Sequence, residues 1–547
     1  MNDLNFNNEF SYKENKSNLF ISFNRAAFIF FIFIIIAFIF SSKIIYLGAQ
    51  QKDITKKNMS KSDFRSSILD RDGNILAKSV ITTNIGINPN LVIDKKKLLI
   101  NLRLIFPEKN FIEIKKNLDG KKFFYLEKKI SQEKYNKIML LGDKSIITED
   151  KISRIYPQKE LYSHLIGQID DDNNGISGLE LSFDYELSTS EKNLNLSLDT
   201  DLQYLIREEL KKAGEIFKTK GSAAILMNIN NGEILSMVSL PDFDLNKREL
   251  INDVNYINRA TKGVYELGSV FKTFTYAAGL EEKEIKPDTL FKNLEKKIKC
   301  AGRTIGEYDD KIPSDLTAEE ILIRSGNIGS VRIGQKIGIE KLKNFLEKIG
   351  IQSKLKFDIF EVGEPLPFKW GKCKLATVSF GHGITTTPLQ LAKAYAIISN
   401  GGFDINPTIL KKNEIVKSKR ILKKGVSNQV NLALRKVVTT AEGTAEFANV
   451  PGYEVGGKTG TAQKVLHTGG YSKKKVNTFA AVFPISKPKY VLITLLDETQ
   501  ISSDYVYNYR NKKGSFKGTP FNTAGWTTVE IAGKIIENIG PILATKY

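Results

Sequence analysis

The sequence predicts an α+β protein that carries a single N-terminal membrane helix. Three observations support this prediction. A charge-free apolar run extends from Ala26 to Ser42. Strand-like apolar segments nearer the C-terminus are joined by short connections, which favours antiparallel pairing, and helical stretches between them predict a sheet covered by helices. With 547 residues and an apolar fraction of 41%, the chain is long enough for about three or four domains with packed cores.

The chain is basic, with 81 Lys and Arg against 61 Asp and Glu, a net charge of +20. Such an excess can indicate nucleic-acid binding, but the lysines are scattered rather than gathered into an arm or stripe. We therefore expect no nucleic-acid partner. A basic exterior would suit anionic lipid headgroups, and the simplest interpretation is solubility combined with a compositional bias towards Lys, Ile and Asn.

Residues 1–25 are polar and are expected to form a tail without regular structure. Segment 26–47 is long enough to cross the hydrocarbon core, which needs about 20 residues, and Lys43 can reach the interface. No small-residue cleavage site follows a short apolar core, so a retained anchor is predicted rather than a cleaved signal peptide. Basic residues flank both ends of the span and leave its orientation open.

Residues 48–195 are expected to form one mixed domain of short strands and basic amphipathic helices, the latter at 95–106 and 111–118. Turns are predicted at 70–74 and 170–175, where Gly and Asn tolerate positive φ. The acidic run at 170–172 could indicate a calcium loop, but it lacks the alternating ligands and terminal Glu of such loops, so a solvated turn is expected. The domain contains no catalytic constellation, which predicts a spacer or docking role.

Residues 196–547 show clearer strand and helix patterns. Asn230-Asn231-Gly232 predicts a hairpin turn between two apolar strands. The strands are expected at 223–229, 233–240, 453–464, 477–484 and 490–496. The helices are expected at 201–212, 318–323, 339–349, 388–399 and 527–539.

A candidate nucleophile, Ser269, lies three residues before Lys272, at the start of a stretch (273–282) that favours helix. Both side chains should share one face. A serine hydroxyl needs a base, and a partly buried amine with a lowered pKa can act as one. The spacing alone is weak evidence in a lysine-rich chain. It recurs at Ser131/Lys134, Ser353/Lys356, Ser472/Lys475 and Ser486/Lys489.

Two further polar motifs lie downstream, Ser325-Gly326-Asn327 and Lys458-Thr459-Gly460-Thr461. A second hydroxyl, at Ser325, can relay protons while the Asn327 side chain holds a substrate amide. The cation of the second motif, with its two threonine hydroxyls, can bind a carboxylate, and Gly460 lets a substrate backbone lie against the strand.

The ordered motifs S-x-x-K, S-x-N and K-T-G resemble the signature of the serine penicillin-recognising enzymes. Ser325 follows Ser269 by 56 residues and precedes Lys458 by 133. These separations are similar to those of class B penicillin-binding proteins, the monofunctional peptidoglycan D,D-transpeptidases. Further residues resemble this family's motifs: Arg65, Asp70, Arg71 and Gly73; Arg154, Tyr156, Pro157, Gly178 and Glu180; and Asn258 to Ala260. Four later segments resemble the FtsI-type cell-division member more than the elongation-type member: 370–371, 380–383, 387–390 and 400–402. Ser66, Leu267 and Asn228 depart from the family pattern, outside the catalytic motifs.

The resemblance implies a role for each motif residue. Ser269 would be the acylated nucleophile, Lys272 its base and Ser325 the proton relay. Asn327, Lys458, Thr459, Gly460 and Thr461 would contact substrate, and the N–H groups of Ser269 and Thr461 would form the oxyanion hole. The serine would attack the D-Ala-D-Ala carbonyl of one stem peptide, release D-Ala and transfer the acyl group to an amine of a neighbouring stem. Penicillins would trap the acyl-enzyme.

The resemblance also implies an organisation: cytoplasmic tail 1–25, anchor 26–47, pedestal domain of the dimerisation type 48–195, and β-lactamase-like transpeptidase domain 196–547. The catalytic domain would lie in the periplasm on the inner membrane and act in septal cell-wall synthesis, with a membrane glycosyltransferase and other division proteins as partners. The alternatives are an elongation-type transpeptidase of the same class, a serine β-lactamase or β-lactam sensor, and an inactive division scaffold.

No cofactor or metal is expected, because the histidines at 164, 382 and 467 lie far apart and lack the spacing of paired ligands. The two cysteines, Cys300 and Cys373, could form a disulfide in an oxidising compartment or remain as buried thiols, and the sequence leaves both possibilities open.

A free lysine with a pKa near 10.4 is about 99.9% protonated at pH 7, so Lys272 needs a lowered pKa to act as a base. The apolar side chains of Val270, Phe271 and Phe274 should disfavour its charge, and Lys458 in the same cleft would repel it. Lys458 itself is expected to stay charged, because it would attract the substrate carboxylate.

Overall fold

The structure is a computed structural model that describes residues 9–11, 20–54, 64–247, 254–300, 302–412, 418–465 and 470–547. The chain divides into two compact units, Met1–Asp63 and Phe64–Tyr547.

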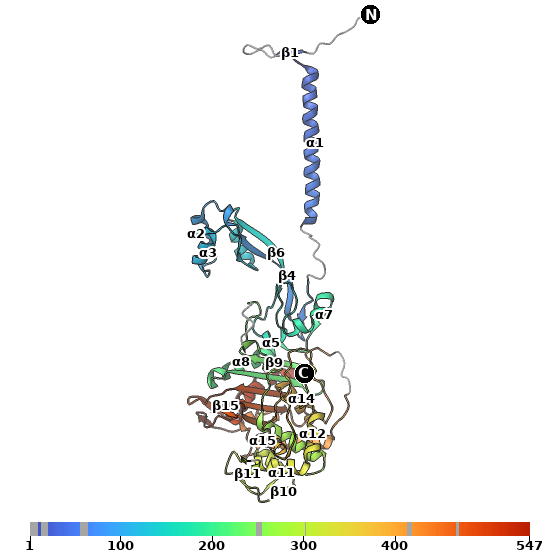
Figure 1. The fold of residues 1–547 in the computed structure, drawn as a ribbon, viewed down its shortest axis with the longest axis vertical. Coiled ribbons are helices and arrows are strands. Elements are labelled where there is room, and N and C mark those ends of the chain that lie inside the picture. The colour runs from blue at the N-terminus through green and yellow to red at the C-terminus, as the bar shows by residue number, and fades with distance from the viewer. Residues whose placement is uncertain are drawn as a thin grey trace. The chain divides into compact units, whose positions relative to one another are not determined.

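The first unit contains the long helix α1 (Phe23–Ile54), drawn in blue in Figure 1. Its stretch Ala27–Tyr46 comprises 20 residues with a mean hydropathy of 2.7, enough to cross a membrane, in agreement with the anchor expected at 26–47. The expectation that 1–25 lacks regular structure is wrong, because β1 (Glu9–Ser11) and β2 (Phe20–Ser22) pair antiparallel. Each strand carries an aromatic residue, a type that favours extended backbone.

The N-terminal part of the second unit contains a mixed sheet in the order β5-β4-β3-β7, with β6 paired to β4. Three amphipathic helices, α2, α3 and α4, bury their apolar stripes with β4 in a separate small core. Side chains of Asp94, Asn110 and Ser131 cap them. The two helices predicted here are confirmed to within one residue at each end. The elements are β3 (Ile68–Leu69), β4 (Ile75–Ile87), α2 (Lys95–Ile105), α3 (Phe111–Asp119), β5 (Phe124–Glu127), α4 (Gln132–Met139), β6 (Ile146–Ile155), α5 (Ser163–Ile166), α6 (Gly178–Ser182), α7 (Asp184–Thr189) and β7 (Leu194–Asn195).

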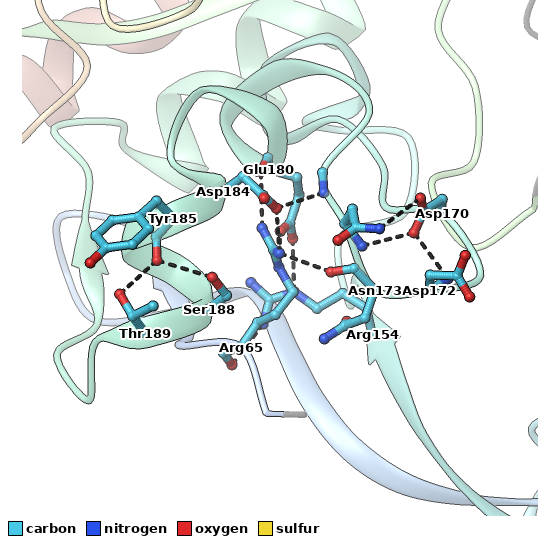
Figure 2. Close-up of polar contacts among 12 residues, drawn as sticks. Arg65, Arg154, Asp170, Asp172, Asn173, Glu180, Asp184, Tyr185, Ser188 and Thr189 are labelled. Carbon is cyan, nitrogen blue, oxygen red and sulfur yellow. Dashed lines mark hydrogen bonds and ion pairs between the residues drawn. The ribbon is translucent and has the colours of Figure 1, made fainter. Parts of the chain in front are cut away.

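A buried ion cluster joins distant segments of this part (Figure 2). Glu180 accepts hydrogen bonds from Nε of Arg65 (2.9 Å) and Nε of Arg154 (2.7 Å), and all three side chains are at most 1% exposed. Arg65 also donates to Asp184 (2.6 Å). The family-like residues of three separate segments therefore meet at one carboxylate, and each charge depends on the others for its compensation.

The acidic run at 170–172 forms the expected turn, also seen in Figure 2. The side chain of Asp170 accepts the N–H groups of Asp172 (3.0 Å) and Asn174 (2.8 Å), and Asn173 has φ of 69°. These are the side chain to backbone bonds typical of an Asx turn.

The main sheet has five antiparallel strands in the order β14-β15-β16-β8-β9. The predicted strands are confirmed, with boundaries that shift by a few residues, and Gly232 has the positive φ (79°) that the hairpin turn requires. The strands are β8 (Gly221–Asn228), β9 (Ile234–Leu240), β14 (Gly456–Val465), β15 (Tyr471–Phe483) and β16 (Tyr490–Asp497).

Helices cover both faces of this sheet. Alternate residues of β8 point to opposite faces: Ala223 and Ile225 pack in a core with α9, α14 and α15, whereas Ala224 and Leu226 pack in a second core with α8 and α16. The sheet is therefore the buried middle layer of an α+β domain. The helices are α8 (Thr200–Phe217), α9 (Lys272–Glu281), α10 (Ala318–Ile323), α11 (Asn327–Ile337), α12 (Ile339–Lys348), α13 (Lys372–Ser379), α14 (Pro388–Ser399), α15 (Lys424–Thr439) and α16 (Thr528–Lys546).

In the described part of 196–547, three small antiparallel strand pairs lie outside the main sheet. The pairs are β10 (Leu290–Phe291) with β13 (Leu316–Thr317), β11 (Lys297–Cys300) with β12 (Arg303–Gly306), and β17 (Val506–Asn508) with β18 (Ser515–Lys517). A disulfide between Cys300 and Cys373, with 5.6 Å between the Cα atoms, ties the β11–β12 hairpin to α13.

Candidate active site

Ser269 lies in a 3-10 turn, η4 (Gly268–Phe271), that leads directly into α9. The backbone of this turn touches two other segments. A Cβ at Gly268 would lie 2.7 Å from the carbonyl oxygen of Thr461, and one at Gly381 would lie 1.9 Å from the carbonyl oxygen of Gly268. Only glycine allows such close approach at positive φ (64° and 88°). The candidate nucleophile is thus held against the Lys458-Thr459-Gly460-Thr461 segment of β14.

Lys272 is the first residue of α9, and its side chain is buried. Its Nζ donates to the carbonyl oxygen of Ser325 (2.5 Å), to Oδ1 of Asn327 (2.7 Å) and to Oγ of Ser325 (3.2 Å). Nζ of Lys458 donates to the same Ser325 Oγ (2.8 Å). One hydroxyl therefore lies between two amines from segments far apart in the sequence, and the three motifs meet in one buried site.

Burial lowers the pKa of Lys272 from its ordinary 10.5 to about 7, and the negative charge of Glu307 opposes this shift. The predicted direction is confirmed, and its main cause is loss of hydration among buried neighbours such as Phe271 and Phe274. An amine with a pKa near neutrality can accept the proton of a hydroxyl.

We expected Lys458 to stay charged, but its surroundings in the unliganded site disfavour the charged form. Burial, and then the like charge of Lys272, hold the pKa of Lys458 well below its usual range. Both amines donate to Ser325 Oγ, so a positive charge on one of them disfavours a positive charge on the other. A carboxylate bound in the site would favour the charged form of Lys458.

Ser325 adopts a left-handed conformation (φ 56°) between α10 and α11. This region is unfavourable for a residue with a Cβ, and such strain persists where the surroundings fix it, often at functional sites. Backbone N–H groups of Ser325 and Gly326 donate to Leu322 (3.2 Å) and Ile321 (2.9 Å), which hold the turn in place.

The motif on β14 occupies one edge of the main sheet. Oγ1 of Thr459 lies 3.2 Å from Nζ of Lys458 and 2.8 Å from Oγ1 of Thr444. Oγ1 of Thr461 accepts the N–H of Ala524 (2.9 Å). An edge strand can pair with an added extended peptide. Gly460 itself packs against the turn before Ser269, because a Cβ there would lie 2.1 Å from the carbonyl oxygen of Leu267.

The sequence did not indicate one residue of this region, Glu307, which immediately follows β12. Its carboxylate accepts the N–H groups of Asn327 (2.6 Å) and Ile328 (2.8 Å) at the start of α11. It belongs to no recognisable motif and lies 20 residues before Asn327. The sequence offered one indication that another segment caps this helix. The N-cap residue of α11 is Gly326, which has no side chain and so cannot cap the helix itself.

Within the described residues, no group of three or more His, Cys, Asp or Glu side chains could hold a metal ion. Nε2 of His164 lies 2.7 Å from the carbonyl oxygen of Asn255, and His382 lies beside Glu266 (3.7 Å). The histidine at position 467 lies outside the described residues.

Comparisons with known proteins agree with this geometry. The model of the penicillin binding protein transpeptidase domain matches residues 222–517, and that of the penicillin-binding protein dimerisation domain matches residues 63–215. The chain is 31% identical over 498 residues to the probable peptidoglycan D,D-transpeptidase FtsI of Caulobacter vibrioides, covering 88% of this chain and 82% of the relative. It is 30% identical to the peptidoglycan D,D-transpeptidase FtsI of Buchnera aphidicola subsp. Baizongia pistaciae, covering 90% and 94%. The crystal structure of apo penicillin binding protein 3 from Mycobacterium tuberculosis has the same fold, with a TM-score of 0.65 at 21% identity and coverage of 88% and 96%.

Proposed function

Because this chain belongs to the FtsI-type class B penicillin-binding proteins, which are serine-type peptidoglycan D,D-transpeptidases, we propose that Ser269 is its catalytic nucleophile. The observation that carries the proposal is the meeting of three motifs at one hydroxyl. Ser325 Oγ lies 3.2 Å from Nζ of Lys272 and 2.8 Å from Nζ of Lys458, beside the turn that holds Ser269.

In the proposed mechanism, neutral Lys272 removes the proton of Ser269 Oγ as this oxygen attacks the carbonyl carbon between the two D-Ala residues. The oxyanion that forms is stabilised by the N–H groups of Ser269 and Thr461. Collapse breaks the peptide bond, and Ser325 passes its proton to the leaving amine of D-Ala while it takes up the proton held by Lys272. An amine of a second stem peptide then gives a proton to Lys272 as it attacks the acyl carbon, and Ser269 Oγ leaves and takes that proton back, which completes the cross-link. A β-lactam acylates the same oxygen. Its opened ring stays attached as part of the acyl group, so no fragment leaves the site and the acceptor amine has no room to enter.

We assign substrate binding to the remaining motif residues. Lys458, protonated when a carboxylate enters, would bind the terminal carboxylate together with the hydroxyls of Thr459 and Thr461. Asn327 would hold a substrate amide, and the peptide backbone would lie along β14 at Gly460. The missing side chain of Gly460 also leaves room for the turn before Ser269, since a Cβ there would lie 2.1 Å from the carbonyl oxygen of Leu267. The edge position of β14 supports this assignment.

The organisation and location of the chain complete the proposal. We place the dimerisation-type pedestal at 48–195, the transpeptidase domain at 196–547 and the catalytic domain in the periplasm, with 26–47 as the anchor in the inner membrane. We further propose a septal role, with a membrane glycosyltransferase and other division proteins as partners. The two family matches, the apolar helix and the relatives named FtsI support these assignments.

The proposal is tested with the full-length protein in detergent and a fluorescent penicillin. A long-lived adduct on the peptide that contains Ser269, absent from a Ser269→Ala variant, is expected. Rapid hydrolysis of a chromogenic cephalosporin would instead identify a β-lactamase. For the cellular role, we expect a fluorescent fusion at mid-cell and failed septation when Ser269→Ala replaces the wild type. Support of septation by Ser269→Ala would indicate an inactive scaffold, and a lateral-wall signal would indicate an elongation-type enzyme.

A further inference from the structure

The start of α11 carries a functional residue but lacks a local cap. A helix leaves its first N–H groups without intrahelical partners, and these are usually bonded by the side chain of the residue before the helix. Gly326 occupies that position and has no side chain, while Asn327 is the first residue of the helix. Another segment must therefore supply the acceptor.

The acceptor is the carboxylate of Glu307. Each of its two oxygens accepts one hydrogen bond. Oε2 accepts from the N–H of Asn327 (2.6 Å), and Oε1 accepts from the N–H of Ile328 (2.8 Å). A negative charge at this end also matches the positive end of the helix dipole. The carboxylate of Glu307 thus fixes the position of the Asn327 backbone.

The same hairpin holds the Asn327 side chain. Nδ2 of Asn327 donates to the carbonyl oxygen of Gly306 (2.8 Å), which leaves Oδ1 to accept from Nζ of Lys272 (2.7 Å). With one side of the amide fixed by a carbonyl, the amide cannot flip without losing both bonds. The N–H of Glu307 in turn donates to the carbonyl oxygen of Lys296 (3.0 Å), which anchors the end of the hairpin.

We infer that Glu307 is a positioning residue of the transpeptidase site, which fixes Asn327 from outside its own helix through the N–H groups of Asn327 and Ile328. This inference rests on the proposed roles of Ser269, Lys272 and Asn327. Two ionisable groups face the base from neighbouring segments. Glu307, which follows the β11–β12 hairpin, raises the pKa of Lys272, and Lys458 on β14 would oppose protonation of Lys272 when Lys458 itself is charged.

Glu307→Gln separates this role from a purely structural one. The amide keeps the size of the side chain but loses the charge and one of two acceptor oxygens. We expect the second-order rate of acylation by a fluorescent penicillin to fall by about 10-fold to 100-fold at the alkaline plateau, the scale of a small misplacement in an active site. The acid limb of the pH profile should also move to lower pH, because the pKa of Lys272 falls when Glu307 no longer raises it. A structural defect alone would lower the rate without moving the limb.

Two variants control this test in the full-length protein in detergent. Asp309→Asn makes the same charge change two residues away at an exposed carboxylate that accepts only the N–H of Lys311 (2.9 Å) among the described contacts, and it should match wild type in rate and pH profile. Glu307→Asp keeps the charge with a shorter reach, so its rate should fall while its acid limb stays at the wild-type pH. If thermal unfolding shows that Glu307→Gln does not fold, the acylation rate of Glu307→Asp tests the inference in its place.

The outcomes distinguish this inference from the proposed function. Wild-type kinetics for Glu307→Gln, or a lowered rate with an unmoved acid limb, would overturn the inference while leaving the function intact. In the Asp variant, the inference is overturned by a wild-type rate. Labelling that persists in Ser269→Ala would instead overturn the proposed nucleophile, whatever the behaviour at position 307.

Discussion

Lys272→Arg tests the general-base role most directly. The fall of the Lys272 pKa from 10.5 to about 7 raises the neutral fraction of this amine at pH 7 from roughly 1 in 3,000 to about one half. An arginine keeps the charge but does not deprotonate, so the base is lost rather than weakened. A positioned base contributes about 100-fold to 10,000-fold, and we expect acylation of Ser269 to slow by about 100-fold or more.

The assay is the second-order rate of acylation by a fluorescent penicillin, measured between about pH 5 and pH 9. Protonation of Lys272 removes the base, so the wild-type rate should rise with pH through a midpoint near 7, and this limb should vanish in Lys272→Arg. Lys458→Arg is the control, because it should mainly weaken carboxylate binding and cost less. Its permanent charge should also move the acid limb to lower pH. A Lys272→Arg enzyme within a few-fold of wild type would refute the reasoning.

Three further predictions concern how the fold supports the site. Glu180→Gln takes away the ion pair of buried Arg154 and leaves Arg65 with Asp184 alone, so it should cost about 3–5 kcal/mol in unfolding free energy by denaturant titration. Glu133→Gln, in an exposed ion pair with Lys137, should cost under about 1 kcal/mol, and equal costs would contradict the buried cluster. Replacing both Cys300 and Cys373 by Ser should lower thermal stability by up to about 4 kcal/mol, the chain-entropy value for this loop length, and reductant should then have no further effect. Gly381→Ala should slow acylation by about 100-fold, because its Cβ would displace the turn that carries Ser269, and wild-type acylation would show that the turn adapts.

Much of the secondary structure could be predicted, because apolar periodicity reports burial directly. The strands around Gly232 and the helix at 388–399 follow from local pattern and turn chemistry. Strand ends shift where a single residue decides the backbone: Glu454 has φ of 46°, so β14 begins at Gly456 rather than at position 453. Such a local conformation has no signature in the surrounding sequence.

The chemistry of the site could be predicted only in part. Ser269 and Ser325 belong to motifs that occur in a fixed order along the chain together with K-T-G. This combination allowed both serines to be predicted as candidate site residues. Glu307 could not, because its task is to complete a helix that starts 20 residues later, and any acceptor on a neighbouring hairpin could do so. Whether the two cysteines form a disulfide could not be predicted either. Their proximity across 73 residues depends on how α13 packs against the β11–β12 hairpin.

The lowered pKa of Lys458 has a physical consequence for the site. We expected Lys458 to be charged before a carboxylate binds. Its amine is buried beside that of Lys272, and both amines donate to Ser325 Oγ. With no anion present, the site tolerates at most one of the two charges at low cost. A carboxylate that enters would favour the charged form of Lys458, and a positive charge on Lys458 would then disfavour protonation of Lys272. The ligand carboxylate would thus favour the neutral form of the base when a substrate is in place, which links recognition of the terminal carboxylate to activation of Ser269.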